Sequence, residues 1–467
     1  MSTILLLLAT SATALQGTRA DLEAGRVTAV IEALAPLAER GDATSQTLAL
    51  LAEAWVSLYR FDLAEPLLDR LEAAPPPPGD DLVRLAERLA EAARMGRAGA
   101  LIDSALARRP DDRALLLGAA RQRIGLGEPA QALGFLDRLG DAPDATAFAL
   151  RGIALRARGR SEDAERALRR AVELEPTSAA AQEELGRLLE ERGDLDGALR
   201  AYEAALARDG NRGASALGRA RILARRGSEE ADLALLRFRV IHAFEEDEKI
   251  LLARAVEDPS TAAAWAALGV FYAEHRQFQR SLAPLRRALD LDPADAGAAE
   301  TLARALVARG EIEEAEAIYA ALRARFPSRA DIPLRLAEAA EERDDAARAR
   351  ALLAEAVRLG GRGADAEMLR GRLAMRGGDA AGAARSFREA TRRDPRCAEC
   401  WLVWSLLLIE VGSAAEAEEE IRSALERDPR NAAPRLALSR LLEAAGRGAD
   451  AARERRLYER DALERRY

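Results

Sequence analysis

Apolar residues recur along this chain at the spacing of amphipathic helices, and residues 262–274 show the pattern most clearly. Trp265, Leu268, Gly269 and Tyr272 are spaced i, i+3, i+4 and i+7, so they occupy one face of a helix. Gly269 carries no side chain, which allows a second helix to cross this face closely. We therefore expect a helix whose apolar face packs against a neighbouring helix.

A second amphipathic helix is predicted directly afterwards. Residues 276–279 are expected to form the turn, and Leu282, Leu285 and Leu289 continue the apolar stripe. Pro293 ends this helix, because proline has no N–H to donate and disfavours helical dihedral angles at the residue before it. Residues 262–295 thus predict two helices and a stop.

This helix pair recurs from about residue 45 to the end of the chain. The starts from residue 262 to residue 432 are each 34 residues apart, every unit has a small residue at its eighth position, and most have alanine at their twentieth. Such a period indicates one repetitive array rather than several globular domains. The predicted first residues are Ser45, Gly79, Arg113, Ala145, Ala179, Gly213, Ala262, Ala296, Ala330, Ala364, Ala398 and Ala432.

The unit resembles the tetratricopeptide repeat, a 34-residue helix pair with the pattern W, LG, Y, A, F, A, P. Ser281 and Leu285 replace the Ala and the Phe of that pattern, and the residues that match it are Trp265, Leu268, Gly269, Tyr272, Ala288 and Pro293. The resemblance covers nearly the whole chain. It implies an all-α fold, a right-handed superhelical solenoid of about twelve tetratricopeptide-like helix pairs, which holds a protein or peptide partner in its concave groove.

One interruption divides the array. The step from Gly213 to Ala262 is 49 residues, well beyond the repeat length of 34. We expect a helical insertion at residues 228–261, formed by one long helix or two consecutive helices. It would separate an amino-terminal array at 21–227 from a carboxy-terminal array at 262–467 that ends in a charged cap. Residues 15–42 are interpreted as a degenerate thirteenth pair that covers the apolar end of the array.

Residues 1–20 are interpreted either as an export signal or as a frayed first helix. Residues 4–9 form a short apolar core and Ala12, Thr13 and Ala14 have the form of a cleavage site, but no Lys or Arg precedes the core. Cleavage would make the protein periplasmic or exported, and an intact amino terminus would make it cytoplasmic. No other stretch approaches the roughly 20 apolar residues of a membrane-spanning helix, so we expect no integral membrane span.

The sequence offers little for catalysis. His242 and His275 lie in different repeats without metal-ligand spacing, no phosphate-binding loop is present, and the repeats leave no stretch for a separate catalytic domain. We expect no enzyme activity, no cofactor and no metal site, and an enzyme with an unrecognised site is the least favoured alternative. The formal net charge of −8 argues against a nucleic-acid partner held through its phosphates.

Cys397 and Cys400 form the only sulfur pair, in the sequence CAEC. In a suitable fold, a C-x-x-C motif is a redox site or supplies two of the four ligands of a zinc site. This chain has no second pair to complete a zinc site. The simpler interpretation is two small residues at tolerant positions. If the protein is exported, a local disulfide is expected instead.

Five arginines are the candidate partner-binding residues. In the tetratricopeptide family the ninth position of the first helix faces the groove, and Arg121, Arg221 and Arg372 occupy it with no acidic residue four positions away. Arg225 and Arg376 add positive charge one turn later. These guanidinium groups would bind an acidic segment bidentately, unless acidic residues of adjacent repeats neutralise them.

The function that we expect is a noncatalytic protein-interaction scaffold, acting in the assembly of a bacterial envelope complex. The alternative is a cytoplasmic regulatory or adaptor module. Fold alone does not decide between the two, because this kind of solenoid binds many classes of partner.

Overall fold

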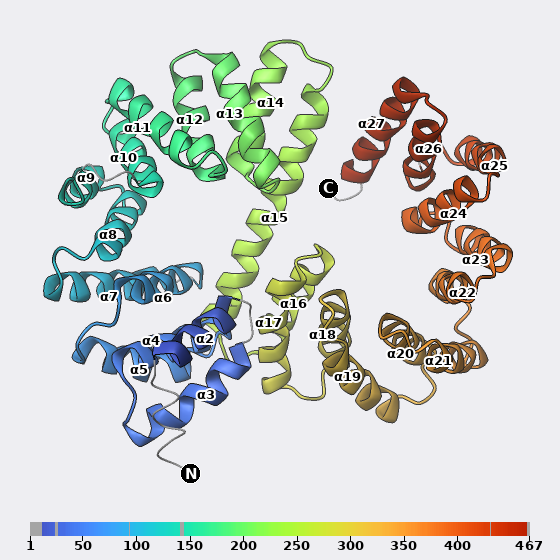
Figure 1. Cartoon of the computed structure of the whole chain (residues 1–467), viewed down its shortest axis with the longest axis horizontal. Helices are drawn as coiled ribbons and strands as arrows, with labels where there is room; N and C mark the ends of the chain where they lie inside the picture. Colours follow the sequence, from blue (N-terminus) through green and yellow to red (C-terminus); the bar gives the residue numbers. More distant parts are fainter. Residues whose placement is uncertain (1–11, 24–26, 93, 141–143, 430, 465–467) are drawn as a thin grey trace. The chain divides into compact units, whose positions relative to one another are not determined.

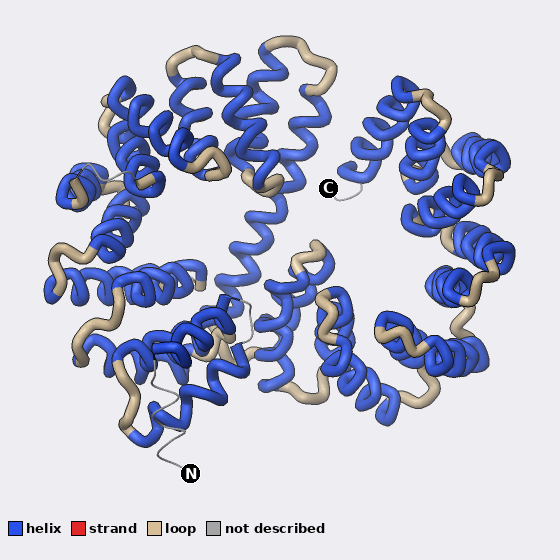
Figure 2. The backbone as a smooth tube through the Cα atoms, viewed as in Figure 1, coloured by secondary structure: helices blue, strands red, loops and turns tan. Residues whose placement is uncertain are grey.

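The computed structural model describes residues 12–23, 27–92, 94–140, 144–429 and 431–464. Every regular element among these residues is a helix, and no strand occurs among them (Figure 1, Figure 2). The all-α solenoid predicted from the repeat is therefore confirmed. Residues 1–11, which contain the apolar core of the suggested export signal, lie outside the described residues.

The helices alternate as first and second members of successive pairs. The amino-terminal helices are α2 (Ala12–Glu23), α3 (Val27–Arg40), α4 (Ser45–Ser57), α5 (Phe61–Ala73), α6 (Gly79–Glu91), α7 (Met95–Arg108), α8 (Arg113–Gly125), α9 (Pro129–Arg138), α10 (Ala145–Ala157), α11 (Ser161–Leu174), α12 (Ala179–Glu191), α13 (Leu195–Arg208), α14 (Gly213–Arg225) and α15 (Ala231–Glu257). The remaining helices are α16 (Ala262–Glu274), α17 (Phe278–Leu291), α18 (Ala296–Ala308), α19 (Ile312–Arg325), α20 (Asp331–Glu342), α21 (Ala346–Arg358), α22 (Ala364–Arg376), α23 (Ala380–Arg393), α24 (Ala398–Glu410), α25 (Ala414–Arg427), α26 (Ala433–Ala444) and α27 (Gly448–Glu464).

Ten of the twelve first helices begin at the residue that the period predicts, and α20 and α26 begin one residue later. Before these twelve pairs, α2 and α3 together form the additional pair expected at the amino end. The turn between α16 and α17 is shorter than expected, because α17 already begins at Phe278 rather than after residue 279.

The turn between the two helices of a pair has a fixed backbone conformation. The fifteenth residue of the repeat has a positive φ, between 64° and 83°, in the eight units where it is glycine. The same position holds Tyr59, Arg276 and Asp344, which are the only non-glycine residues with positive φ in the described part of the chain. A left-handed residue ends a helix by satisfying its last carbonyl groups, and glycine adopts that conformation without strain.

Small residues at two repeat positions allow the two helices of each pair to pack closely. The alanines at the twentieth position are at most 2% exposed, from Ala64 to Ala451. The eighth position, on the first helix, faces them. At Gly186 this position lies directly against an aromatic ring of the second helix. A Cβ on Gly186 would lie 2.8 Å from the Tyr202 ring, well inside van der Waals contact. The close crossing predicted from this position is thus present.

The chain divides into two compact units. The amino-terminal unit comprises residues 1–271 and 286–293, and the carboxy-terminal unit comprises residues 272–285 and 294–467. In both units the first helices of neighbouring pairs contact one another, as α10 does with α12 and α24 with α26. Figure 1 shows α9 outside α8 and α10, and α25 outside α24 and α26. The first helices therefore form the inner layer of each unit.

The expected insertion is one continuous helix. α15 has 27 residues, about twice the length of an ordinary second helix of this chain, and it packs against α14. Within the amino-terminal unit its central Phe244 stacks on Phe271 with the ring centroids 4.8 Å apart. Beyond α15, Trp265 of α16 lies 4.8 Å from the ring of Tyr59 in the α4–α5 turn. The long second helix thus brings α16 back to the beginning of the array (Figure 1).

Candidate functional site

The five arginines lie on first helices, as the sequence predicts. Arg121 lies on α8, Arg221 and Arg225 lie on α14, and Arg372 and Arg376 lie on α22. All five side chains are exposed or nearly so, and they are therefore accessible to solvent. Four of the five nevertheless form ion pairs with carboxylates of the preceding repeat.

Arg221 makes the most complete of these ion pairs. Its Nε and Nη2 atoms donate to the two carboxylate oxygens of Glu190 on α12, at 3.1 Å and 2.8 Å. The same carboxylate accepts a 2.9 Å hydrogen bond from the hydroxyl of Tyr202, whose ring is fully buried. Burial and the hydrogen bond that Tyr202 donates to Glu190 raise the pKa of Tyr202, and the hydrogen bonds that Arg221 donates to Glu190 raise the pKa of Arg221. Glu190 therefore joins three consecutive helices.

The arrangement recurs in the carboxy-terminal unit. Arg372 Nε lies 2.9 Å from Glu341, and the 31 residues between these two positions equal the separation of Arg221 from Glu190. Arg376 also contacts Glu341, at 3.0 Å, and pairs with Asp344. The side chain of Glu341 is 4% exposed, so two guanidinium groups share one buried carboxylate.

Arg121 pairs with Glu87 of α6, one repeat earlier. For four of the five arginines, adjacent repeats thus supply the neutralising carboxylates, which was the alternative interpretation. Glu87, Glu190 and Glu341 were not predicted, because they lie on the first helix of the preceding repeat and not four positions from the arginines on the same helix. A search for acidic residues about one repeat earlier would have found all three, because neighbouring first helices are in direct contact.

Arg225 differs from the other four. It has no ion-pair partner among the described residues, although it occupies the same repeat position as Arg376. The reason lies in the preceding repeat: Arg376 pairs with Asp344, and the residue equivalent to Asp344 is Gly193. The other available carboxylate, Glu190, is already bound by Arg221 and Tyr202.

An open groove of about 490 Å³ adjoins Arg225 in the amino-terminal unit. Its apolar lining comes from Ala214 and Leu217 beside the buried Tyr202, and its charged lining residues are Arg187, Glu190, Glu191, Arg221 and Arg225. The two glutamates already have partners, since Glu190 pairs with Arg221 and Glu191 pairs with Arg156. A segment that enters the groove would therefore meet an exposed guanidinium group beside an apolar surface.

A buried carboxylate stabilises the same region. Glu183 of α12 accepts from Arg212 Nε and Nη2 at 3.1 Å and 3.0 Å, and from the Ser215 hydroxyl at 2.7 Å. Burial alone would raise its pKa, but the hydrogen bonds from Arg212 and Ser215 outweigh burial and lower it. This carboxylate holds the beginning of α14, which carries Arg221 and Arg225, against α12.

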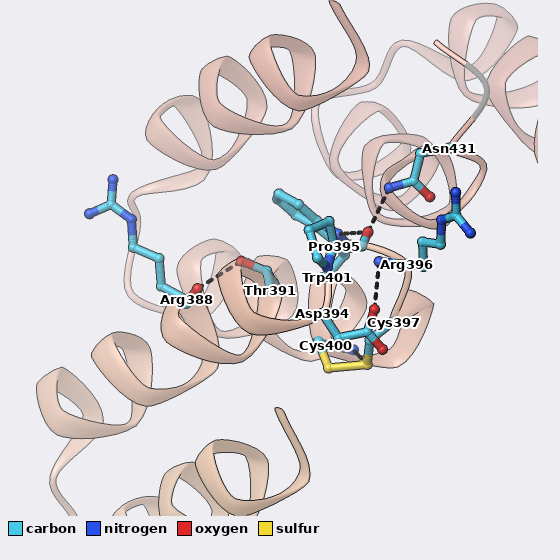
Figure 3. Close-up of a disulfide and its surroundings, with 9 residues drawn as sticks. All are labelled: Arg388, Thr391, Asp394, Pro395, Arg396, Cys397, Cys400, Trp401 and Asn431. Atoms are coloured by element: carbon cyan, nitrogen blue, oxygen red, sulfur yellow. Dashed lines mark hydrogen bonds between the residues drawn. A yellow bond between two sulfur atoms is a disulfide. The ribbon is translucent and has the colours of Figure 1, made fainter. Parts of the chain in front are cut away.

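Cys397 and Cys400 are joined by a disulfide at the beginning of α24 (Figure 3). Cys397 is the N-cap residue of this helix, and its Sγ accepts a hydrogen bond from the Cys400 backbone N–H at 3.0 Å. Cys400 is fully buried, whereas Cys397 is half-buried.

The remaining candidates for chemistry are dispersed. His242 stacks on Phe238 with the ring centroids 5.5 Å apart, and His275 lies in the α16–α17 turn. Among the described residues, no group of three or more His, Cys, Asp or Glu side chains is arranged to hold a metal ion. In the same part of the chain, no helix has both the length and the apolar character needed to span a membrane.

Comparison with known proteins matches several parts of this chain to a family described as tetratricopeptide repeat. The matches cover residues 150–212, 188–237, 272–332 and 368–408. A comparison with curated proteins found no match.

Solved structures with similarity to the chain include the APC/C hetero-tetramer Cut9–Hcn1, at 16% identity and a TM-score of 0.37, covering 93% of this chain and 99% of that chain. Yeast Tom70 aligns at 15% identity and a TM-score of 0.32, covering 90% and 98%. A tetratricopeptide repeat protein from Parabacteroides merdae aligns at 19% identity and a TM-score of 0.32, covering 56% and 98%.

The family matches fall on helix pairs of both units, and the same pair with the same turn and the same small core positions continues between them. The matched segments of the chain are tetratricopeptide repeats.

Proposed function

We propose that the protein is a noncatalytic scaffold that binds an acidic segment of a protein partner along its first helices, in the assembly of a bacterial envelope complex. Tetratricopeptide repeats are protein-interaction modules, which supports the general role of a scaffold. The observation that carries the specific proposal is Arg225, an exposed guanidinium group beside the groove with no ion pair among the described residues.

Charge and shape both favour an acidic segment at this groove. A guanidinium group binds a carboxylate through two parallel hydrogen bonds, and Arg225 has its donors available for this. Arg221 is held in place by Glu190, so it adds positive charge without needing to change its side-chain conformation. The partly exposed Ala214 and Leu217 offer an apolar contact for the residue next to the acidic one.

The second arginine pair is expected to contribute less. Arg372 and Arg376 face one buried carboxylate, Glu341, and one exposed carboxylate, Asp344. Their charges are therefore balanced within the fold. The charge of Arg121 is likewise balanced, by its ion pair with Glu87. We rank Arg225 first, Arg221 second, and the remaining three as supporting residues.

A direct test uses a short fluorescent peptide rich in Glu and Asp and the full-length protein. Replacement of Arg221 and Arg225 by Ser is expected to weaken binding about tenfold or more, because charge-assisted hydrogen bonds are lost. The Arg372→Ser, Arg376→Ser variant should have a smaller effect. Arg208→Ser and Arg358→Ser, which change exposed arginines on second helices, are the matched controls. Equal binding by all variants at physiological salt would exclude the proposal.

The location in the envelope is supported by the disulfide, because such bonds persist mainly in oxidising compartments. The alternative is a cytoplasmic regulatory or adaptor module. The mature amino terminus, measured by mass spectrometry on protein from its native host, separates the two. An amino terminus near residue 15 supports the envelope, and an intact Met1 or Ser2 supports the cytoplasm.

A further inference from the structure

The two sulfur atoms of the disulfide differ in their surroundings. Cys400 is 0% exposed and belongs to the core cluster of the carboxy-terminal unit, together with Phe387 and Trp404. Cys397, at the other end of the same bond, is half-buried and caps the amino terminus of α24 (Figure 3). A thiol that approaches from solvent therefore has better access to Cys397 than to Cys400.

Cys397 is also placed where a thiolate is stabilised. Its Sγ accepts the Cys400 N–H at the beginning of α24, where the helix dipole favours negative charge. The adjacent Arg396 is exposed and adds positive charge, while Asp394 is engaged by the Arg396 backbone N–H at 2.9 Å. The hydrogen bond to Sγ and the helix dipole lower the cost of forming the Cys397 thiolate when the disulfide opens.

The loop does not depend on the disulfide for its position. The carbonyl oxygen of Pro395 accepts hydrogen bonds from Trp401 Nε1 at 2.9 Å and from Asn431 Nδ2 at 2.6 Å (Figure 3). The bond itself joins residues only three positions apart in the sequence, so it restricts the unfolded chain little. The loop before α24 should therefore keep its conformation after the disulfide is reduced.

We propose that the Cys397–Cys400 disulfide is a thiol–disulfide exchange site, at which a dithiol partner attacks Cys397 in the folded protein. In the first step the partner's thiolate forms a bond to Cys397 Sγ, the Cys397–Cys400 bond breaks, and Cys400 leaves as a thiolate that takes up a proton. In the second step the partner's other thiol, deprotonated, attacks its own bridged sulfur and releases the Cys397 thiolate. The two cysteines gain two electrons and the partner is oxidised to a disulfide.

The reverse reaction assigns the same roles. The Cys397 thiolate attacks an oxidised partner, and the buried Cys400 then displaces that partner to restore the disulfide. This activity does not rest on the proposed binding of acidic segments, because the cysteines and Arg225 lie in different units.

Reduction of the full-length protein with dithiothreitol tests the proposal. We expect the disulfide to open under native conditions at a rate proportional to the dithiothreitol concentration, with an unchanged far-UV circular dichroism spectrum. Free thiols would be counted by alkylation and mass spectrometry. Substoichiometric iodoacetamide, added to the reduced wild-type protein, should label Cys397 before Cys400. A reduction rate that is independent of dithiothreitol and equal to the unfolding rate would overturn the proposal.

Two single-cysteine variants provide the matched comparison. Cys400→Ser leaves the half-buried Cys397, and we expect it to react with the aromatic disulfide 5,5′-dithiobis(2-nitrobenzoate) at least about tenfold faster than Cys397→Ser, which leaves the fully buried Cys400. Equal reactivity of the two folded variants would also overturn the proposal. The labelling of the wild-type protein decides the question if either variant fails to fold.

Discussion

Gly371 on α22 faces the aromatic ring of Phe387 on α23 so closely that a Cβ atom at position 371 would overlap the ring. Phe387 is 2% exposed and cannot move aside without opening the core. The contact shows why the residue at the eighth repeat position is small. The side chain that faces it from the second helix determines how much room is left for a side chain on the first helix.

Replacement of Gly371 by alanine is therefore expected to destabilise the protein by about 1–3 kcal/mol, even though alanine is the better helix former. The melting temperature measured by circular dichroism would fall. The control is Gly134→Ala on α9, where an added Cβ meets no atom within 4 Å. That variant should be stabilised by about 0.5–1 kcal/mol. Equal shifts in both variants would contradict the packing argument.

Replacement of Arg276 by glycine is expected to stabilise the protein, in contrast to the replacement of Gly371. It occupies the left-handed turn position with φ of 59°, and its side chain is exposed. Arg276→Gly should stabilise the protein by about 0.5–1 kcal/mol, because the strain of a left-handed residue exceeds the entropy cost of glycine. Gly310→Ala, the reverse change at the equivalent position with φ of 79°, should destabilise it by about 1 kcal/mol. If Arg276→Gly lowered the urea midpoint, strain at this turn would be excluded.

The sequence was sufficient to predict the helix pairs, because their apolar spacing and 34-residue period are local properties of the chain. The starts at Gly79 and Ala398 were predicted to the residue. The contact of Tyr59 with Trp265 could not be predicted, since it depends on the path that the long helix α15 takes between residues far apart in the sequence.

The candidate site was predicted in part. The first helices do carry Arg221 and Arg372, but their ion pairs with Glu190 and Glu341 depend on which positions of neighbouring repeats face each other. That register is set by how successive pairs stack, which a single repeat does not reveal. Whether Arg225 binds a partner remains a prediction.

The pair formed by Arg372 and Glu341 can be measured by a double-mutant cycle. Arg372→Met and Glu341→Gln are expected to show a coupling free energy of about 0.5–2 kcal/mol, because the carboxylate is buried and the guanidinium group is only partly exposed. The exposed pair Arg170 and Glu173, within α11, is the control and should couple by less than about 0.5 kcal/mol. A coupling as small as that of the control would mean that the inter-repeat pair contributes nothing to stability.

The last prediction concerns acid stability and Glu183. Its hydrogen bonds from Arg212 and Ser215 stabilise the carboxylate, so its pKa in the folded protein lies below the ordinary value of 4.5. The unfolded chain binds this proton more readily than the folded protein does. The stabilisation is therefore fully present above the ordinary pKa, and it is lost as the pH falls through the lower, folded-state pKa.

Glu183→Gln removes this titration while keeping the size of the side chain. At neutral pH we expect the variant to be less stable by about 1–3 kcal/mol, because a charged, partly buried hydrogen-bond network is broken. The difference from the wild type should shrink as the pH falls below about 4.5, since the wild-type carboxylate then becomes neutral as well. Glu173→Gln, at an exposed position, is the control and should follow the wild-type profile closely. Urea unfolding between neutral and acidic pH provides the measurement, and a stability difference that stays constant over this range would show that Glu183 does not act through its charge.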